Sequence, residues 1–186
     1  MPAIIERKFL YTICINGEDG DIMKLLVLSD SHSGRSFMRL CIEKIKPDAI
    51  VHLGDYESDG EVVQSENPGV PFYQVPGNCD YGFGSMFSAI RFENIGGIRV
   101  FMTHGHRHGV KSGTERLIAD GRSEEAQLIL YGHTHIPDCH PEPGGIWVVN
   151  PGSCRSYDGS VAVVTIENCQ IKGCKILRMS DLEEIL

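Results

Sequence analysis

The sequence predicts a layered α/β domain, and two patterns along the chain support this. In the first half, short apolar runs typical of buried strands alternate with amphipathic helices. In the second half, strands predominate, which favours a layered arrangement over a simple doubly wound sheet. The chain of 186 residues is long enough for one domain with a substantial core, and we place this single domain at residues 23–186.

The expected elements follow from the apolar pattern and from helix-breaking residues. Buried strands are predicted at residues 24–29, 49–53, 70–75, 98–103, 127–131 and 146–149. An antiparallel hairpin is predicted from two further strands, at residues 161–167 and 170–178. Helices are predicted at residues 36–46, where Pro47 stops the helix, and at 112–120 and 180–185. Specificity is expected to lie in loops, such as those at residues 56–70, 81–95 and 136–145.

Composition excludes several classes of function. The formal net charge is −8 and no cluster of lysine and arginine is present, so a groove for long nucleic acid is not expected. No apolar run is long enough to span a bilayer, and residues 1–22 lack the pattern of a signal peptide. The seven cysteines form no CxxC pair, which favours reduced, mostly buried thiols and a cytoplasmic location. Whether the chain forms a homo-oligomer is left open.

Residues 1–22 are interpreted as an N-terminal extension. Residues 17–22 add no hydrophobic pattern, and Met23 stands directly before the first predicted strand. We therefore hypothesise that Met23 is the true start and that the upstream residues come from a misassigned reading frame. Against this, alternating apolar residues resemble an edge strand that could pack on the domain or on a neighbouring chain: Phe9, Tyr11, Ile13 and Ile15.

Five predicted strands end next to a polar residue able to bind a metal ion. These residues are Asp30, Asp55, Asn78, His104 and His133. In open α/β sheets ligands bind beyond the carboxyl ends of the strands, so we expect these side chains to converge on one rim. His32 and His135 lie two residues after Asp30 and His133, and in an extended segment side chains at this spacing lie on the same side.

The seven residues form a mixed set of nitrogen and oxygen donors. Four imidazoles, two carboxylates and one amide suit transition metals better than calcium, which prefers oxygen alone. Seven ligands are too many for one zinc ion and about right for two ions that share the carboxylate of Asp55. Two ions roughly 3.5–4 Å apart suit phosphoryl transfer, in which a water molecule between them attacks phosphorus.

The motifs also resemble those of a known family. The strings LSDSH at 28–32, GD at 54–55, GNCD at 77–80, THGH at 103–106 and GHTH at 132–135 resemble the calcineurin-like metallophosphoesterases, and NPGS at 150–153 is similar to their small prokaryotic YfcE-like branch of phosphodiesterases. The resemblance covers residues 23 to about 178. It implies a four-layer α/β/β/α sandwich, with two mixed β-sheets flanked by helices.

The resemblance also implies roles for the residues and a small phosphoester as substrate. One divalent ion would be held by Asp30, His32 and His135 and the other by Asn78, His104 and His133, with Asp55 as the bridge. The metal would be Mn, Ni, Fe, Co or Zn. The expected catalytic residues are Asp55, Asn78 and His104, together with His106 as a candidate acid.

One position departs from the larger relatives. Where they carry GNH, with a histidine thought to assist the leaving group, this chain has Cys79. A thiol is a poor general acid for an alkoxide, so Cys79 favours diesters or esters with good leaving groups over phosphoprotein substrates. Cys79 is usual in the small branch.

Other readings of the sequence stay open. The same fold serves as a non-catalytic scaffold in a retromer subunit that has lost key ligands, and a nucleotide-specific phosphatase is a further alternative. His52 is expected to pack in the core and Asp80 to hold a turn or a ligand. Arg35 and Arg155 could contact a phosphate or lie on the surface. Glu57 and Asp59 are expected to cap the turn that follows Asp55, and His108 is expected near the site in a supporting or solvent-exposed role.

Overall fold

The computed structural model describes residues 22–80 and 88–183. Its strands are β1 (Ile22–Leu28), β2 (Ala49–His52), β3 (Phe72–Gln74), β4 (Ile90–Ile95), β5 (Ile98–Thr103), β6 (Leu128–Leu130), β7 (Asp138–Pro141), β8 (Trp147–Asn150), β9 (Ser160–Glu167) and β10 (Gln170–Arg178). Its helices are α1 (Arg35–Ile45), α2 (Glu57–Glu66), the 3₁₀ helix η1 (His106–His108), α3 (Glu115–Ser123) and α4 (Met179–Glu183).

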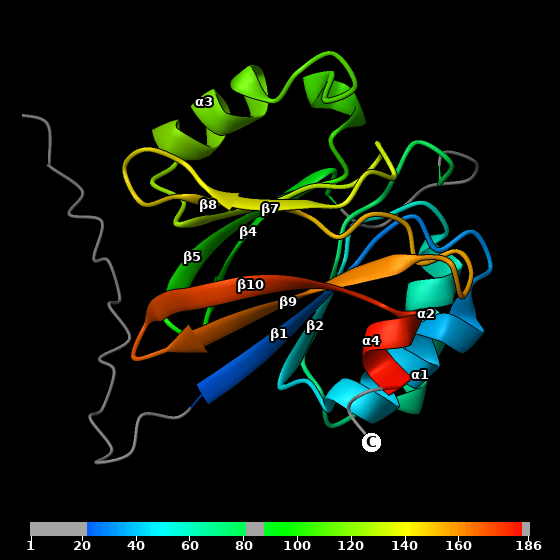
Figure 1. Cartoon of the computed structure of the whole chain (residues 1–186). Helices are drawn as coiled ribbons and strands as arrows, with labels where there is room; N and C mark the ends of the chain where they lie inside the picture. The colour runs from blue at the N-terminus through cyan, green and yellow to red at the C-terminus, as the bar shows by residue number, and fades with distance from the viewer. Residues whose placement is uncertain (1–21, 81–87, 184–186) are drawn as a thin grey trace, which may run out of the picture.

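Two mixed five-stranded sheets form the centre of the molecule. Sheet A has the order β10-β9-β1-β2-β3, and sheet B has the order β4-β5-β6-β8-β7. The sheets lie face to face, with α1, α2 and α4 on the outer side of sheet A and α3 on the outer side of sheet B (Figure 1). The predicted four-layer α/β/β/α sandwich is therefore confirmed.

The central strands are apolar on both faces because each face meets a different core. In β1, Leu25 and Val27 belong to the core between the sheets, whereas Leu26 and Leu28 belong to the core under α1. In β5, Phe101 packs under α3. Each fully buried aliphatic or aromatic side chain contributes about 1.5–3 kcal/mol relative to an exposed one. The continuous apolar runs of the sequence thus encode strands covered on both sides.

Helix α1 shows how the local sequence sets an element's limits. Phe37, Cys41 and Ile45 recur on one face and are buried in the core between α1 and sheet A. The helix ends at Lys46, whose φ of 50° is left-handed, and Pro47 follows. The helix therefore covers sheet A and returns the chain to β2.

Three of the expected loops contain regular structure, which corrects that prediction. Residues 56–70 contain helix α2, residues 81–95 contain edge strand β4, and residues 136–145 contain edge strand β7. The buried residues of α2 are Asp59, Gly60 and Val63, so an apolar helical period is missing. Strand β7 has the sequence Asp-Cys-His-Pro, which shows no apolar alternation, and its proline is tolerated because β7 lies at the edge of sheet B.

Several other expectations bear on the fold. Residues 1–21 lie outside the described part, so the edge-strand reading of the extension stays a prediction; Ile22 already belongs to β1 and pairs with Glu167. The free cysteines of the described residues are Cys41, Cys79, Cys139, Cys154 and Cys174. Within residues 22–80 and 88–183, no helix is long and apolar enough to cross a membrane.

Candidate metal centre

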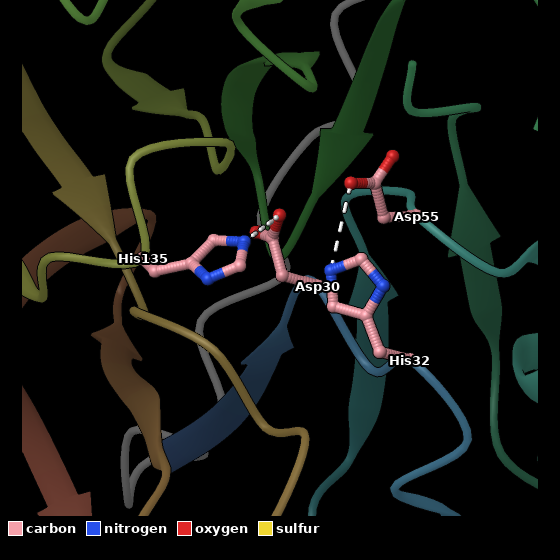
Figure 2. Close-up of side chains that lie close together, drawn as sticks. All are labelled: Asp30, His32, Asp55 and His135. Atoms are coloured by element: carbon pink, nitrogen blue, oxygen red, sulfur yellow. Dashed lines mark ion pairs between the residues drawn. The ribbon is translucent and has the colours of Figure 1, made fainter. Parts of the chain in front are cut away.

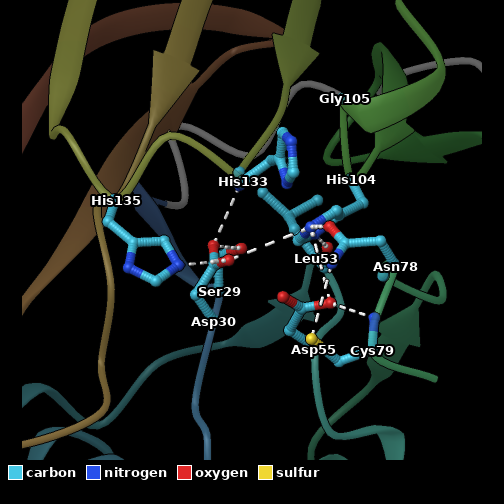
Figure 3. Close-up of polar contacts among 12 residues, drawn as sticks. Ser29, Asp30, Leu53, Asp55, Asn78, Cys79, His104, Gly105, His133 and His135 are labelled. Carbon is cyan, nitrogen blue, oxygen red and sulfur yellow. Dashed lines mark hydrogen bonds and ion pairs between the residues drawn. The ribbon is translucent and has the colours of Figure 1, made fainter. Parts of the chain in front are cut away.

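The strand ends converge as the sequence predicts. The loops after β1, β2 and β3 carry Asp30, Asp55 and Asn78 from sheet A. The loops after β5 and β6 carry His104 and His133 from sheet B. Figure 3 shows these side chains pointing toward one another between the two sheets. The rim is therefore built by both sheets together.

The backbone at these loops is held in an unusual conformation. Five of the seven predicted ligands have a positive φ: Asp30 (52°), His32 (41°), Asp55 (57°), His133 (70°) and His135 (59°). The left-handed region is costly for residues other than glycine, on the order of 1–3 kcal/mol each, and such strain collects at functional sites. Here it turns each side chain off its strand and into the common site.

One group of ligands surrounds Asp30. Asp30, His32, Asp55 and His135 each offer an atom, and these atoms all lie within 4.8 Å of one another. His135 Nε2 is 3.0 Å from Asp30 Oδ1, and His32 Nε2 is 3.7 Å from Asp55 Oδ2 (Figure 2). This group comprises the three residues expected to hold the first ion, together with the expected bridge.

The second group surrounds His104. Its Nε2 lies 3.1 Å from Asn78 Oδ1, 3.5 Å from Asp55 Oδ1 and 3.9 Å from Asp30 Oδ1. The rings of His104 and His133 have their centroids 5.1 Å apart. Asp55 thus contacts both groups, as a bridging ligand must.

The donor set fits a cation. His104 Nδ1 lies 2.7 Å from the carbonyl oxygen of Leu53 and must donate to it, so a neutral His104 directs the lone pair of Nε2 at three acceptor oxygens. Asp30 Oδ1 is buried and receives no hydrogen bond from the described residues, although His135 Nε2 is near. Converging lone pairs in a buried place require positive charge between them.

Asp55 is positioned by the turns that enclose it. Gly54 has a φ of 98°, and a Cβ there would meet the backbone of Gly77. Burial alone would raise the pKa of Asp55, but the N–H of Cys79, which donates to Oδ1 at 2.8 Å, and the nearby His104 outweigh burial and lower it. Asp55 is therefore a carboxylate at neutral pH, as a metal ligand must be.

Asp80 fixes the same turn. Its carboxylate accepts hydrogen bonds from the backbone N–H groups of Asp55, Tyr56, Glu57 and Gly77, at 2.7–2.9 Å. The expectation that Asp80 holds a turn and a neighbouring ligand is confirmed.

Two histidines on the loops of sheet B, His133 and His106, are held in the neutral form. Burial, followed by the neighbouring His104, lowers the pKa of His133. Burial also lowers the pKa of His106 to about 4, with His104 and His133 acting in the same direction. The neutral form suits His133 as a ligand. It disfavours His106 as an acid, because a neutral imidazole is a weak proton donor.

Two residues that hold the ligand loops in place were not predicted from the sequence. The side chain of Asn150, at the end of β8, is fully buried; it donates to Gly132 O and Thr134 Oγ1 and so holds the loop that carries His133 and His135. Ser153 Oγ donates to the carbonyl of Asp30 at 2.8 Å. Both residues belong to the NPGS string at 150–153, but the sequence does not indicate their hydrogen-bond partners, which lie far away along the chain.

Asp59 has a larger role than the turn cap expected for it. It accepts hydrogen bonds from Ser31 Oγ and Ser33 N at 2.8 and 2.7 Å, and it pairs with Arg35 at 3.3 Å. It thus braces the loop that carries Asp30 and His32. Glu57 lies, with Asp59, in the first turn of α2.

The remaining expectations concern residues near the site. His52 is fully buried and lies 3.3 Å from Ser31 Oγ, which confirms its core role. His108 is buried and pairs with Asp120 at 3.5 Å, apart from the ligand groups. Although the residue is exposed, partial desolvation of the thiol, together with Asp55, raises the pKa of Cys79 to about 11, so its thiol stays protonated and is a weak nucleophile.

Comparison with known proteins identifies the family. A profile of the calcineurin-like phosphoesterase superfamily domain matches residues 23–169. The chain belongs to this superfamily. The probable metallophosphoesterase YsnB of Bacillus subtilis strain 168 is 29% identical over 153 residues, which cover 78% of this chain and 86% of that protein. A probable metallophosphoesterase of Mycoplasma pneumoniae is 31% identical over 134 residues, which cover 70% and 78%.

Solved structures agree with this assignment. A conserved protein of Streptococcus pneumoniae TIGR4, described as a predicted phosphoesterase, is 26% identical with a TM-score of 0.68, covering 86% of this chain and 91% of that one. The phosphoesterase YfcE of E. coli has the same fold, at 22% identity and a TM-score of 0.54 over 82% and 98%. So does Vps29 of Cryptosporidium parvum, at 17% identity and a TM-score of 0.65 over 86% and 98%. The expected kinship with the superfamily and its small prokaryotic branch is confirmed.

Proposed function

We propose that this member of the calcineurin-like superfamily is a dinuclear metal-dependent phosphodiesterase that acts on small phosphoesters. The proposal rests on one observation. Between the two sheets, lone pairs of Asp30, Asp55, Asn78 and His104 converge, and the described residues supply too few N–H or O–H groups to pair with them. Such a group of donors is stable only with positive charge at its centre. Two divalent transition metal ions would supply that charge.

Each residue has a defined part in this proposal. Asp30, His32 and His135 would hold one ion, Asn78, His104 and His133 the other, and Asp55 both. Leu53 O fixes the tautomer of His104, while Asp80 and Asn150 hold the loops in place. Two such ions, when bound, polarise the phosphoryl group and make a water molecule more acidic, which assists its attack on phosphorus.

The preference for diesters rests on the groups beside the site. Cys79 is exposed, its pKa is raised, and the pKa of His106 is lowered, so neither is suited to protonate a poor leaving group at neutral pH. Esters with stable leaving anions need no such acid. Aryl phosphodiesters are therefore the natural first substrates.

The test is a metal add-back experiment. Chelator-treated protein is assayed with bis(p-nitrophenyl) phosphate and p-nitrophenyl phosphate, alone and with Mn, Ni, Co, Mg or Zn. We expect no hydrolysis without metal, recovery with Mn or Ni, and faster turnover of the diester. Full activity in the metal-free protein would refute the proposal.

The second candidate is a non-catalytic scaffold, favoured by the likeness of the fold to Vps29. A scaffold needs no complete ligand set, whereas the seven residues proposed as ligands are all present in this chain and their side chains lie close together. Metal binding without turnover of any ester in the panel would favour the scaffold. Selective hydrolysis of nucleoside monophosphates would favour a nucleotide phosphatase.

A further inference from the structure

A polar pocket adjoins the candidate metal centre. Its volume is about 260 Å³, and its lining residues include His135, Ser153, Arg155, Asp158 and Arg178. His135 belongs to both places, because its Nε2 faces Asp30 and its side chain also lines the pocket. A molecule bound at the metal centre can therefore extend past His135 into the pocket.

Within the described part of the chain, the guanidinium groups of the two arginines of this pocket have no partner. Five arginines of the described chain pair with carboxylates: Arg35, Arg39, Arg91, Arg99 and Arg122. Arg155 and Arg178 form no side-chain ion pair or hydrogen bond with any residue in the described ranges. The chain has a net charge of −8, so two positively charged side chains beside one pocket make this place locally attractive for an anion.

The walls of the pocket are fixed in position. Ser153 Oγ is bonded to the Asp30 carbonyl, and Ser160 Oγ donates to Pro151 O at 2.7 Å. The backbone closes the loop between them, since Ser160 N donates to Ser153 O at 3.0 Å and Gly159 N donates to Ser156 O at 2.8 Å. The loop that carries Arg155 is thus tied to the loop that carries Asp30, which fixes the backbone from which the Arg155 side chain extends beside the pocket.

We propose that this pocket binds a second phosphate group of the substrate. The favoured substrates are then phosphodiesters in which the part of the molecule that lies beside His135 bears a further phosphate. The proposal rests on the proposed function of the metal centre. The guanidinium groups of Arg155 and Arg178 present planar donors that match phosphate oxygens. Asp158 is the opposing carboxylate of the pocket and moderates the attraction.

The test compares two matched ligand pairs that differ by one distant phosphate. Binding of thymidine 3′,5′-bisphosphate and of thymidine 5′-phosphate is measured by calorimetry on the Mn-loaded protein. The corresponding 5′-(p-nitrophenyl) esters, with and without the 3′-phosphate, are assayed for KM and kcat. We expect the additional phosphate to lower Kd and KM about tenfold when both guanidinium groups contact it together.

Variants assign the effect to the pocket. Arg155→Gln and Arg178→Gln should each remove most of the gain from the additional phosphate and leave the values for the simpler ligands unchanged, whereas Asp158→Asn should increase the gain. Arg116→Gln on α3 removes the same charge from an exposed site and should change nothing.

The two proposals fail in distinguishable ways. Equal Kd values for the two nucleotides, or equal losses for both ligands in the arginine variants, would overturn the pocket proposal. Absence of hydrolysis of both esters would overturn the proposed activity, and the binding comparison would still decide the role of the pocket.

Discussion

At the scale of single residues, Asp55 is the side chain on which both ligand groups depend. Its two oxygens lie 3.7 Å from His32 Nε2 and 3.5 Å from His104 Nε2. Asp55→Asn replaces one oxygen by an amide that cannot bridge two cations, so we expect the bound metal to fall from two ions per chain to one or fewer. Elemental analysis at fixed free metal measures this. His106→Ala, beside the site, should keep two ions; the reverse pattern would refute the ligand assignment.

Cys79 governs the response to the leaving group. Since neither Cys79 nor neutral His106 protonates a leaving alkoxide well, the rate should fall steeply as the pKa of the leaving alcohol rises. Cys79→His introduces an imidazole at an exposed position and should flatten this dependence. Rates over a series of aryl methyl phosphates measure the slope. A flat series in the unmodified protein would mean that another acid, such as His106, is already present.

His52 makes the stability of the fold depend on pH. Complete burial lowers its pKa to about 4, from an ordinary value of 6.5. Below pH 6.5, His52 therefore binds a proton in the unfolded chain but stays neutral in the folded protein. The stability that is present above pH 6.5 is lost as the pH falls toward 4. By linkage the full effect is at most about 3 kcal/mol.

The matched variant for this prediction is His52→Gln, which keeps a polar atom near Ser31 but does not titrate. Urea unfolding of the metal-free protein at pH 7 and pH 5 gives the comparison. The unmodified protein should lose about 2 kcal/mol more than the variant. Parallel losses in both proteins would show that His52 does not carry the effect.

At the scale of elements, the site is positioned by loops that are bonded to one another across the fold. The amide of Asn150 spans from the end of β8 to the loop after β6, where it contacts Gly132 O and Thr134 Oγ1 at 3.1 and 3.0 Å. Asn150→Ala removes both hydrogen bonds and leaves the buried N–H of Gly152, which donates to Asn150 Oδ1 at 2.9 Å, without its acceptor, so we expect a loss of about 2–3 kcal/mol in stability. Metal affinity should fall about 10–100-fold, because His133 and His135 lose their support.

Calorimetric metal titration and urea unfolding of Asn150→Ala test both parts. Asn67→Ala is a suitable control, because Asn67 also donates from its amide to a backbone carbonyl, that of Val63, but at the end of α2. It should cost some stability and leave metal affinity unchanged. Equal metal affinity in both variants would mean that Asn150 supports the fold alone.

The sequence was most informative where the pattern is local. Strands β1, β2 and β5 were predicted because both of their faces are buried, and the ligands were predicted because each stands just after a strand. Helix α2 was missed because its buried side includes Asp59 and Gly60. The roles of Asn150 and Ser153 were missed because their partners are 16 to 123 residues away, a distance that one sequence cannot bridge.

At the scale of the whole molecule, each predicted ion would join the two sheets. Sheet A supplies Asp30, Asp55 and Asn78, and sheet B supplies His104 and His133. The core between the two sheets sets the distance between these ligands. The strands that precede the ligands all contribute fully buried side chains to this core, except β3, whose Tyr73 is partly buried against it. The geometry of the centre is therefore a property of the packed sheets and not of one loop.

This arrangement implies that the extension at the N-terminus is dispensable. None of the seven ligands lies in residues 1–22, and the superfamily profile begins at residue 23. Met23 pairs with Ile166 and packs against the core between the sheets, so a chain that starts there keeps all of the β1–β9 ladder except the pair of Ile22 with Glu167. That terminal pair contributes little, because strand ends fray.

We therefore expect a protein that starts at Met23 to fold and to bind two metal ions. Its free energy of unfolding should lie within about 1 kcal/mol of that of the full chain, and its specific activity should be equal. Urea unfolding, elemental analysis and the diester assay on both proteins provide the comparison. A truncated protein that starts at Leu25 is the matched control: it also lacks Met23 and the ladder partner Lys24, and it should be measurably less stable. Insolubility or loss of metal in the protein that starts at Met23 would make the first 22 residues part of the domain.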